Sequence, residues 1–270
     1  MAINAKNITD DEFFFGHKAC AGCGGSLVVR HALKVLGPNA VAALPAGCMS
    51  ATGFNFPQLS FSNNAMITPF AATSSVISGI EVGLKAQGKD PSEYTVVGFA
   101  GDGGTADIGL QALSGTIDRN DNVIYICYDN EAYMNTGIQR SSATPKGAWA
   151  TTSEVGKVQQ GKPQKRKDLT SIMAAHGVPY VAQATVGNWR DLVSKAEKAI
   201  AVDGPAFLNI MAPCPRGWRI DSSMTAEICR MAVNSKFWPL FEVENGKWKL
   251  TPVRDKNLIP VKDFLKPQGR

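Results

Sequence analysis

Two polar groups that are far apart in the sequence could together hold a cation. Asp102 lies in the glycine-rich run GDGG at residues 101–104, and Asn130 follows Asp129 at the end of an apolar stretch. Carboxylate and amide oxygens are ligands that Mg²⁺ prefers, and protein-bound Mg²⁺ often joins one or two such groups to substrate phosphates. The pair therefore predicts a clamp for a magnesium diphosphate, formed by Asp102 and the Asn130 amide oxygen.

The same glycine run has two other interpretations. Residues 101–106 fit the dinucleotide-binding pattern G-x-G-x-x-A, with Asp129 at the end of the next strand. In that case Asp102 would lie beside a pyrophosphate, and nothing would offset the repulsion unless a cation bridged them. A purely structural glycine turn is the second alternative. A G-D-G followed by a distant Asn resembles the signature of thiamine-diphosphate proteins, which is the interpretation we favour.

Six cysteines indicate a metal or redox centre rather than disulfides if the protein is cytoplasmic. Four of them lie in loops that we expect at one edge of a sheet: Cys20 and Cys23 in a C-x-x-C loop among glycines, and Cys48 and Cys214 just after strands. We expect the other two, Cys127 and Cys229, to lie inside a buried strand and a helix. The first four therefore form the candidate ligand set.

Cysteine count alone does not distinguish tetrahedral zinc from a [4Fe-4S] cluster, and free buried thiols are a third possibility. Zinc is the better expectation for one C-x-x-C loop and two remote cysteines. The thiamine-type motif reverses that preference. A cofactor that stabilises a carbanion gains nothing electronically from redox-silent zinc, whereas a cluster accepts electrons one at a time.

Alternating apolar strands and helices must position these groups. We expect strands at residues 40–44, 94–100, 122–128, 180–185 and 205–211, and helices at 26–36, 69–87, 106–117, 169–176, 189–202 and 220–231. Ser26 is the expected N-cap of the first helix. This order predicts an α/β fold with a doubly wound, mostly parallel sheet, whose strands deliver the polar groups to their carboxyl edge.

Three further segments have their own predictions. Residues 54–64 are interpreted as a loop over the site, and Glu244-Asn-Gly-Lys247 is a hairpin signal. The Gly/Lys-rich segment 157–167 is predicted to be an exposed loop, either solvated or in contact with a subunit or an anionic substrate. We expect residues 1–230 to form the cofactor-binding domain and 231–270 a tail packed on it or on a partner.

Composition limits the class of protein. The chain of 270 residues, 44% of them hydrophobic, is long enough for one large α/β core but not for two full domains. A net charge of +5, with basic residues scattered outside 157–167, does not support nucleic-acid binding. There is no run of eighteen apolar residues, and Met1 to Asp11 is polar, so we expect neither a membrane span nor a secretory signal, and a cytoplasmic location.

Taken together, five motifs resemble one family. GHKACAGCGG, PAGC, GFAGDGG, YDNEAYMNTG and APCPRGW look like the β subunit of a 2-oxoacid:ferredoxin oxidoreductase, and the pyruvate synthase type is the most similar. The resemblance implies the thiamine-diphosphate-binding type of α/β domain, with thiamine diphosphate, Mg²⁺ and a [4Fe-4S] cluster as cofactors. It runs from about Gly16 to Gly246 and is specific because the motifs occur jointly.

The resemblance also implies roles for individual residues. The cluster would be held by Cys20, Cys23, Cys48 and Cys214. Magnesium would be bound by Asp102, the Asn130 side chain and the Ala132 carbonyl. Gly101, Gly103 and Gly104 would admit the diphosphate, while Gly47, Cys48, Asn130 and Thr136 would lie beside the cofactor and Asn135 would face the thiazolium and the substrate. Some relatives carry Thr at the positions of Asn130 and Ala46, which puts a thiamine contact from Ala46 in doubt.

The implied activity is the oxidative decarboxylation of a small 2-oxoacid, pyruvate first, to acyl-CoA and CO₂, with electrons passed to ferredoxin. The implied partners are a pyrimidine-binding α subunit and a ferredoxin-like cluster subunit. 2-Oxoisovalerate and oxalate stay open as substrates. The rival hypotheses are a non-redox thiamine decarboxylase or carboligase subunit whose cysteines bind zinc or nothing, and a zinc-stabilised binding subunit without chemistry.

Overall fold

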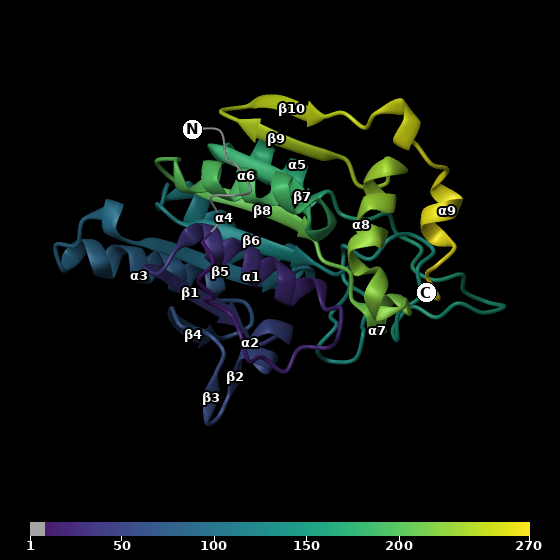
Figure 1. Ribbon diagram of the computed structural model, residues 1–270, viewed down its shortest axis with the longest axis horizontal. Coiled ribbons are helices and arrows are strands. Elements are labelled where there is room, and N and C mark those ends of the chain that lie inside the picture. Colours follow the sequence, from purple (N-terminus) through teal and green to yellow (C-terminus); the bar gives the residue numbers. More distant parts are fainter. Residues whose placement is uncertain (1–8) are drawn as a thin grey trace.

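The computed structural model describes residues 9–270, and its centre is a mixed eight-stranded sheet (Figure 1). The order of the strands is β10-β9-β7-β8-β6-β5-β1-β4. Six neighbouring strands are parallel, and β9 and β10 are antiparallel to their neighbours. The bounds are β1 Ala40–Pro45, β4 Asn64–Thr68, β5 Thr95–Gly101, β6 Ile124–Asp129, β7 Tyr180–Thr185, β8 Ala206–Met211, β9 Leu240–Glu244 and β10 Lys247–Thr251.

The central strands are apolar because helices cover both faces of the sheet. All residues of β6, β7 and β8 are buried, as expected for parallel strands in an α/β protein. One core contains Val28, Leu192 and Ile228 from α1 (Gly24–Leu36), α6 (Trp189–Ile200) and α8 (Thr225–Asn234). The core on the other face contains side chains from α3 (Thr73–Ala86), α4 (Leu110–Asp118) and α5 (Leu169–Ala175). The predicted doubly wound fold is confirmed.

The strand order reverses between β1 and β5, and this creates the crevice where ligands bind in such folds. β1 and β4 lie on one side of β5, and β6 and β8 lie on the other. The carboxyl ends of β1, β5, β6 and β8 are followed by Cys48, Asp102, Asn130 and Cys214, respectively. Segments that are distant in sequence are therefore brought to one edge.

Several predicted helix boundaries were wrong. α1 begins at Gly24 with Cys23 at its N-cap, and Ser26 Oγ instead donates a hydrogen bond to the Cys23 carbonyl at 2.8 Å. The predicted helix 106–117 is a π-helical turn, Gly103–Asp107, followed by α4. The predicted helix 220–231 begins later, at Thr225, after the 3₁₀ turn Ser222–Met224, and α9 (Val261–Leu265) follows it.

Two elements near the site were not predicted. Helix α2 (Cys48–Gly53) begins directly after the PAG turn, and β4 adds an edge strand beyond β1. The predicted loop 54–64 contains a small hairpin, β2 (Phe54–Asn55) with β3 (Gln58–Leu59), and reaches the first residue of β4. β4 escaped prediction because its apolar run is only three residues long, and most of its side chains are exposed, as they are on an edge strand.

The predicted hairpin near the C-terminus is confirmed. β9 and β10 are joined through Asn245 and Gly246, whose φ angles of 48° and 76° are the left-handed values that a type I′ turn requires. β9 pairs with β7, so these two strands extend the main sheet. The proposed division of the chain at residue 230 stays a prediction. The first eight residues of the predicted polar N-terminal stretch lie outside the described residues.

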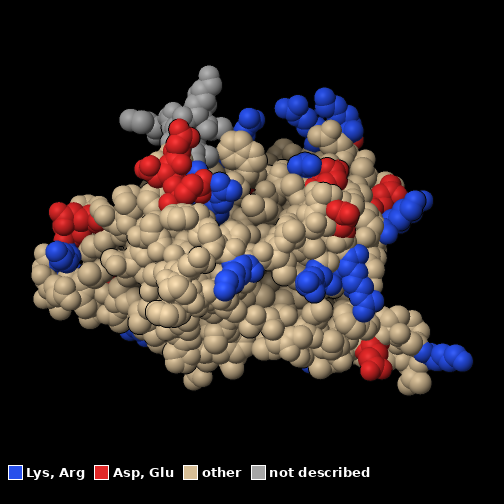
Figure 2. All heavy atoms as spheres, turned by 60° about the horizontal axis from the view of Figure 1, so that its bottom comes forward, with Lys and Arg blue, Asp and Glu red and all other residues tan. Residues whose placement is uncertain are grey.

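Within residues 9–270, none of the helices combines the length and the apolar character that crossing a bilayer would need. One face of the molecule nevertheless has few charges (Figure 2). Residues 35–80, which include α2, β2, β3 and β4, contain no Asp, Glu, Lys, Arg or His. On this segment the side chains of Phe56, Leu59, Met66 and Ile67 are exposed.

Candidate functional site

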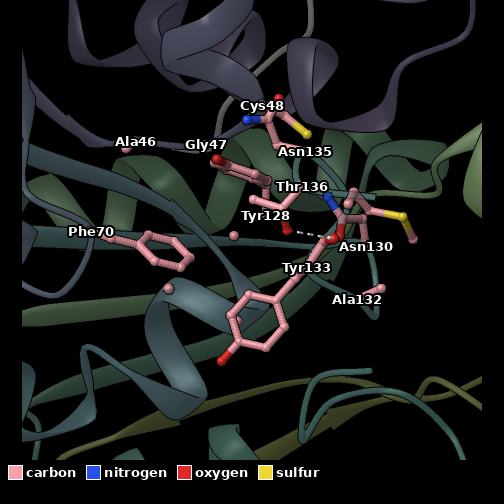
Figure 3. Close-up of a pocket in the computed structure, with 14 residues that line it drawn as sticks. Ala46, Gly47, Cys48, Phe70, Tyr128, Asn130, Ala132, Tyr133, Asn135 and Thr136 are labelled. Atoms are coloured by element: carbon pink, nitrogen blue, oxygen red, sulfur yellow. Dashed lines mark hydrogen bonds between the residues drawn. The ribbon is translucent and has the colours of Figure 1, made fainter. Parts of the chain in front are cut away.

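A pocket opens at the carboxyl edge of the sheet, where the predicted site residues converge (Figure 3). Its empty volume, including the part that is open to solvent, is about 350 Å³. The lining residues are Ala46, Gly47, Cys48, Phe70, Gly101, Gly103, Gly104, Tyr128, Asn130, Ala132, Tyr133, Met134, Asn135 and Thr136. All of the residues predicted to lie beside the cofactor line this pocket except Asp102, which is fully buried.

Three oxygen atoms meet at one corner of the pocket. The Asn130 amide oxygen lies 3.0 Å from Asp102 Oδ1 and 2.9 Å from the Ala132 carbonyl oxygen. None of these atoms carries a proton when Asp102 is ionised, so their approach is repulsive. Turning the Asn130 amide over would replace this repulsion by two hydrogen bonds from its nitrogen. A cation between the oxygens would also remove it.

The spacing suits magnesium. Mg²⁺ binds oxygen octahedrally at about 2.0–2.1 Å, so neighbouring ligand oxygens lie about 2.9–3.0 Å apart. One carboxylate, one amide and one backbone carbonyl are hard oxygen donors of the kind that magnesium selects. The donor set at Asp102, Asn130 and Ala132 thus fits the predicted ion in both chemistry and spacing.

A tight turn after β6 presents two of these oxygens. Asp129 Oδ1 accepts a hydrogen bond from Glu131 N at 3.1 Å, and Glu131 adopts a φ of 67°, which is uncommon for a residue with a side chain. The indole Nε1 of Trp218 donates to the Asn130 carbonyl at 2.8 Å. The turn is therefore held from both ends, and its geometry places Asn130 and Ala132 at the pocket wall.

Buried charges surround this turn. Asp129 and Glu131 both pair with Arg166, and Glu131 also pairs with Arg270. Burial raises the pKa of Asp129 to about 6, although Arg166 opposes this shift. Burial, together with repulsion from Asp129, raises the pKa of Asp102 well above its usual range, against the hydrogen bond from Ser141. Nearby positive charge would therefore favour the ionised form of Asp102.

The prediction for residues 157–167 was wrong in part. Residues 157–160 are exposed, but Lys162 is 1% exposed and its ammonium group donates to the carbonyls of Ser142 and Thr144 at 2.7 and 2.6 Å. Burial lowers the pKa of Lys162 to about 8. Arg166 does not extend into solvent but pairs with Asp129 and Glu131 in the turn after β6. The sequence predicted a solvated loop because the partners of Lys162 and Arg166 are backbone carbonyls and carboxylates that are distant in the sequence.

Close packing explains the glycines that line the pocket. A Cβ atom on Gly103 would lie 2.4 Å from Cε1 of Tyr133, and one on Gly104 would lie 3.1 Å from Cε2 of Phe70. The Tyr133 ring is fixed by its hydroxyl, which donates to Asp107 at 3.1 Å. Any side chain at Gly103 would therefore displace the aromatic wall, and the bare backbone stays accessible from the pocket.

Three of the four candidate cysteines lie at the beginning of a helix. Cys23 and Cys214 are the N-caps of α1 and α7 (Pro215–Trp218), and Cys48 is the first residue of α2. The Gly24 amide donates to the Pro213 carbonyl at 3.1 Å, which joins the C-x-x-C loop to the segment before Cys214. The Cys23 amide likewise donates to the Cys20 carbonyl at 3.1 Å.

The four thiols are close enough to affect one another. Burial raises the pKa of Cys48 to about 12, and repulsion from Cys23, Cys214 and Cys20 adds to this shift. Over residues 9–270, no three His, Cys, Asp or Glu side chains are arranged as a ready metal site. Burial also raises the pKa values of Cys23 and Cys214. Thiols are nevertheless a donor set that suits a thiophilic centre, because a bound metal deprotonates its thiol ligands.

The other two cysteines are separated from this group. Cys127 is buried within β6, where burial and the charge of Asp129 raise its pKa well above the usual range. Cys229 is buried in α8, with its Sγ 3.9 Å from the Met211 carbonyl oxygen. Both therefore lie within regular elements instead of at the loops and helix starts that carry the other four cysteines.

Several residues of the site were missed. The pocket is also lined by Phe70, Tyr128, Tyr133 and Met134. The Ser141 hydroxyl donates a hydrogen bond to Asp102 Oδ2. Tyr128, Tyr133 and Met134 lie within YDNEAYMNTG, so the motif itself could have indicated them. Phe70 follows the unpredicted strand β4, and Ser141 has no local sequence signal.

Comparisons with known proteins identify the family of this chain. The family model "Thiamine pyrophosphate enzyme, C-terminal TPP binding domain" matches residues 45–210. The chain is 48% identical to "Ketoisovalerate oxidoreductase subunit VorB" of Pyrococcus horikoshii over 97% of this chain and 85% of that protein. It is also 48% identical to "Pyruvate synthase subunit PorB" of Methanothermobacter thermautotrophicus over 97% of this chain and 91% of that protein.

A solved structure agrees at the level of the fold. The chain matches the 2-oxoglutarate:ferredoxin oxidoreductase of Magnetococcus marinus with a TM-score of 0.62 and 22% identity, over 83% of this chain and 82% of that one. From the family model and the two curated relatives we conclude that the chain belongs to the thiamine pyrophosphate enzymes and, among them, to the β subunits of the 2-oxoacid:ferredoxin oxidoreductases.

Proposed function

We propose that this subunit holds magnesium, thiamine diphosphate and a [4Fe-4S] cluster for the oxidative decarboxylation of a small 2-oxoacid, with pyruvate favoured. The products would be acyl-CoA, CO₂ and electrons for ferredoxin, and the reaction would be reversible. The observation that carries the proposal is that Cys48 lines the same pocket as Gly101, Asn130 and Ala132. A hydrogen bond from Gly24 to Pro213 joins the loops of the other three cysteines, and repulsion from their thiols helps to raise the pKa of Cys48.

The chain's own residues would bind and orient. Asp102, Asn130 and the Ala132 carbonyl would bind the magnesium, and the backbone of Gly101, Gly103 and Gly104 would lie against the diphosphate. When bound, thiamine diphosphate supplies a carbanion-stabilising thiazolium and the cluster supplies a one-electron acceptor. Asn135 and Thr136 add polar groups to the pocket wall, where they would orient the substrate.

The apolar side chains of the pocket would exclude water. Phe70, Tyr133 and Met134 line it, and the Phe70 and Tyr133 rings meet edge to face with centroids 5.9 Å apart. Excluding water strengthens the electrostatic interactions within a site and limits side reactions. Gly47 completes the wall next to Cys48, where a Cβ atom would lie 3.3 Å from the Tyr128 hydroxyl.

We further propose that a pyrimidine-binding α subunit covers the uncharged segment 35–80 and supplies the Glu that activates thiamine. The support is the exposed apolar group Phe56, Leu59, Met66 and Ile67 on a stretch without charges. The names of the relatives describe subunits of larger enzymes. A ferredoxin-like cluster subunit and ferredoxin would take the electrons, and the complex would work in the cytoplasm.

The two curated relatives leave the substrate open. One is named for pyruvate and one for ketoisovalerate, and this chain is equally similar to both, at 48% identity. Pyruvate remains our proposal. The rival is a subunit of a non-redox thiamine decarboxylase with zinc on the four cysteines, because zinc also suits four thiols.

The test uses the native complex, purified without oxygen and assayed for reduction of a low-potential dye. Pyruvate, 2-oxoisovalerate, 2-oxoglutarate and oxalate are supplied one at a time, with and without CoA. The proposal expects CoA-dependent dye reduction, fastest with pyruvate. CO₂ release from every active 2-oxoacid without dye reduction would favour the non-redox rival, and a preference for 2-oxoisovalerate would replace pyruvate.

A further inference from the structure

The carboxylate of Asp102 is held by different groups at its two oxygens. Oδ1 accepts a hydrogen bond from the backbone N–H of Asn130 at 3.2 Å, and it lies 3.0 Å from the side-chain oxygen of Asn130. Oδ2 points away from that corner and accepts the Ser141 hydroxyl at 2.5 Å. A carboxylate that is bound in this way has one oxygen left for a cation.

The hydrogen bonds around Ser141 fix the direction of its hydroxyl. A hydroxyl has one proton to donate and can accept at its lone pairs. Ser141 Oγ accepts the Ala143 amide at 3.1 Å, so its proton is directed to Asp102. Thr144 Oγ1 accepts the Ser141 amide at 3.0 Å and donates to the Glu131 carbonyl at 2.5 Å. The serine is therefore tied to both of the strand ends that present the oxygens.

Two basic side chains, Lys162 and Arg166, bind the backbone that follows Ser141. The carbonyls of Ser142 and Thr144 accept hydrogen bonds from the buried Lys162, and the carbonyl of Ala143 accepts one from Arg166 at 2.9 Å. Arg166 also pairs with Asp129 and Glu131 next to the oxygen corner. Each of the three carbonyls that follow Ser141 thus accepts a hydrogen bond from the side chain of either Lys162 or Arg166. These bonds restrict where the Ser141 hydroxyl can lie.

We propose that Ser141 is a positioning residue for the cation site, holding Oδ2 of Asp102 so that Oδ1 faces the cation. The inference rests on the proposed function, since the cation is the magnesium of the thiamine diphosphate site. Groups that hydrogen-bond to metal ligands orient them, and their loss typically costs about 10- to 100-fold in metal affinity. The segment 157–167 then contributes to the site through Lys162 and Arg166, which hold the turn.

The experiment measures Mn²⁺ binding, with Mn²⁺ standing in for Mg²⁺ at an all-oxygen site. The assembled complex is freed of divalent metal, given thiamine diphosphate and titrated with Mn²⁺, and free Mn²⁺ is counted by room-temperature electron paramagnetic resonance. Wild type is compared with Ser141→Ala. The matched control is Ser142→Ala, because the neighbouring Ser142 hydroxyl has no hydrogen-bond partner among the described residues.

We expect Ser141→Ala to raise the Mn²⁺ dissociation constant by about 10- to 100-fold. Ser142→Ala should stay within about twofold of wild type, and all variants should keep similar melting temperatures. Excess Mg²⁺ should restore the turnover number of Ser141→Ala, which a general loosening of the fold would not allow. If Ser141→Ala does not assemble, Ser141→Cys decides, because it keeps the volume with a weaker donor and should bind Mn²⁺ less tightly than wild type.

Two results would overturn the inference. The first is an unchanged Mn²⁺ affinity in Ser141→Ala, or in Ser141→Cys if Ser141→Ala does not assemble. The second is an equal loss of Mn²⁺ affinity in Ser141→Ala and Ser142→Ala. Failure of the wild-type complex to bind Mn²⁺ with thiamine diphosphate would instead contradict the proposed function. The two failures are therefore distinguishable.

Discussion

At the scale of single residues, the site depends on one buried carboxylate that faces two other oxygens. Asp102 has no exposed surface, and its Oδ1 lies 3.0 Å from the Asn130 amide oxygen. Such an arrangement is unfavourable alone and favourable around a cation. The residue that the GDGG motif predicts therefore lies where a cation would remove a repulsion, although burial removes it from the pocket lining.

The change Asp102→Asn tests this role directly, because it removes the charge and keeps the volume. We expect thiamine diphosphate affinity to fall by at least about 100-fold in magnesium, since losing a ligand costs more than losing its supporting partner. Iron content should not change. Equilibrium dialysis of the cofactor measures the effect, with Asp118→Asn on the exposed end of α4 as a control. Equal cofactor affinity in both variants would exclude the clamp.

The sequence identified residues within motifs and missed those that act from other loops. Asp102, Asn130, Ala132 and Asn135 were predicted together because they lie in two short, distinctive runs. Ser141, Lys162 and Arg166 were not, because a buried Lys and Arg are recognised only when their carbonyl and carboxylate partners are known. Local sequence carries no record of those partners.

At the scale of elements, the first helix connects the cysteine loops to the sheet. Gly24 packs against the segment before Cys214, and a Cβ atom there would lie 2.5 Å from the Ala212 carbonyl carbon. A Cβ atom on Gly25 would instead lie 3.1 Å from the terminal methyl group of Met49, a flexible side chain that can move. Two adjacent glycines of one helix therefore differ in what a methyl group would displace.

We expect Gly24→Ala to lower the free energy of unfolding by about 1–3 kcal/mol, the usual cost of overpacking. It should also reduce the iron content, because the backbone at Ala212 and Pro213 must shift next to Cys214. Gly25→Ala should cost less and keep its iron. Thermal melting and iron analysis of the two variants in the complex provide the check, and iron loss that is equal in both would contradict this account of the helix N-terminus.

Element boundaries were predictable where the apolar pattern was strong. β7 was predicted residue for residue, and the β9–β10 hairpin followed from Asn245-Gly246, because the turn needs left-handed residues. The edge strand β4 and the π turn at Gly103–Asp107 were not predictable. β4 gains its place by pairing with β1 rather than by burial, and a glycine-rich helical turn has no apolar period.

At the scale of the whole molecule, we expect this chain alone to be inactive. It carries a thiamine pyrophosphate-binding domain, and among residues 9–270 no Glu lines the pocket where it could contact an aminopyrimidine. The proposed contact for a partner that supplies one is the uncharged segment 35–80.

The chain can be expressed alone, reconstituted with iron and sulfide, and assayed with thiamine diphosphate, magnesium and a 2-oxoacid. No sustained dye reduction is expected, while adding the α subunit should restore it. Phe56→Ser, on the fully exposed tip of the β2–β3 hairpin, should weaken binding of the α subunit without changing the melting temperature of the isolated chain. Turnover by the isolated chain at the rate of the complex would refute the shared site.

We propose above all that Cys20, Cys23, Cys48 and Cys214 carry an iron-sulfur cluster beside the thiamine pocket. The most direct measurement is the iron and zinc content of the anaerobically purified complex in three forms: wild type, Cys48→Ser and Cys229→Ala. We predict that Cys48→Ser lowers the iron content by about four atoms per chain, the content of one [4Fe-4S] cluster, and leaves zinc absent. Cys229→Ala, which changes a buried thiol in α8, should keep the wild-type iron. Equal iron in all three forms, or zinc in place of iron, would contradict the account.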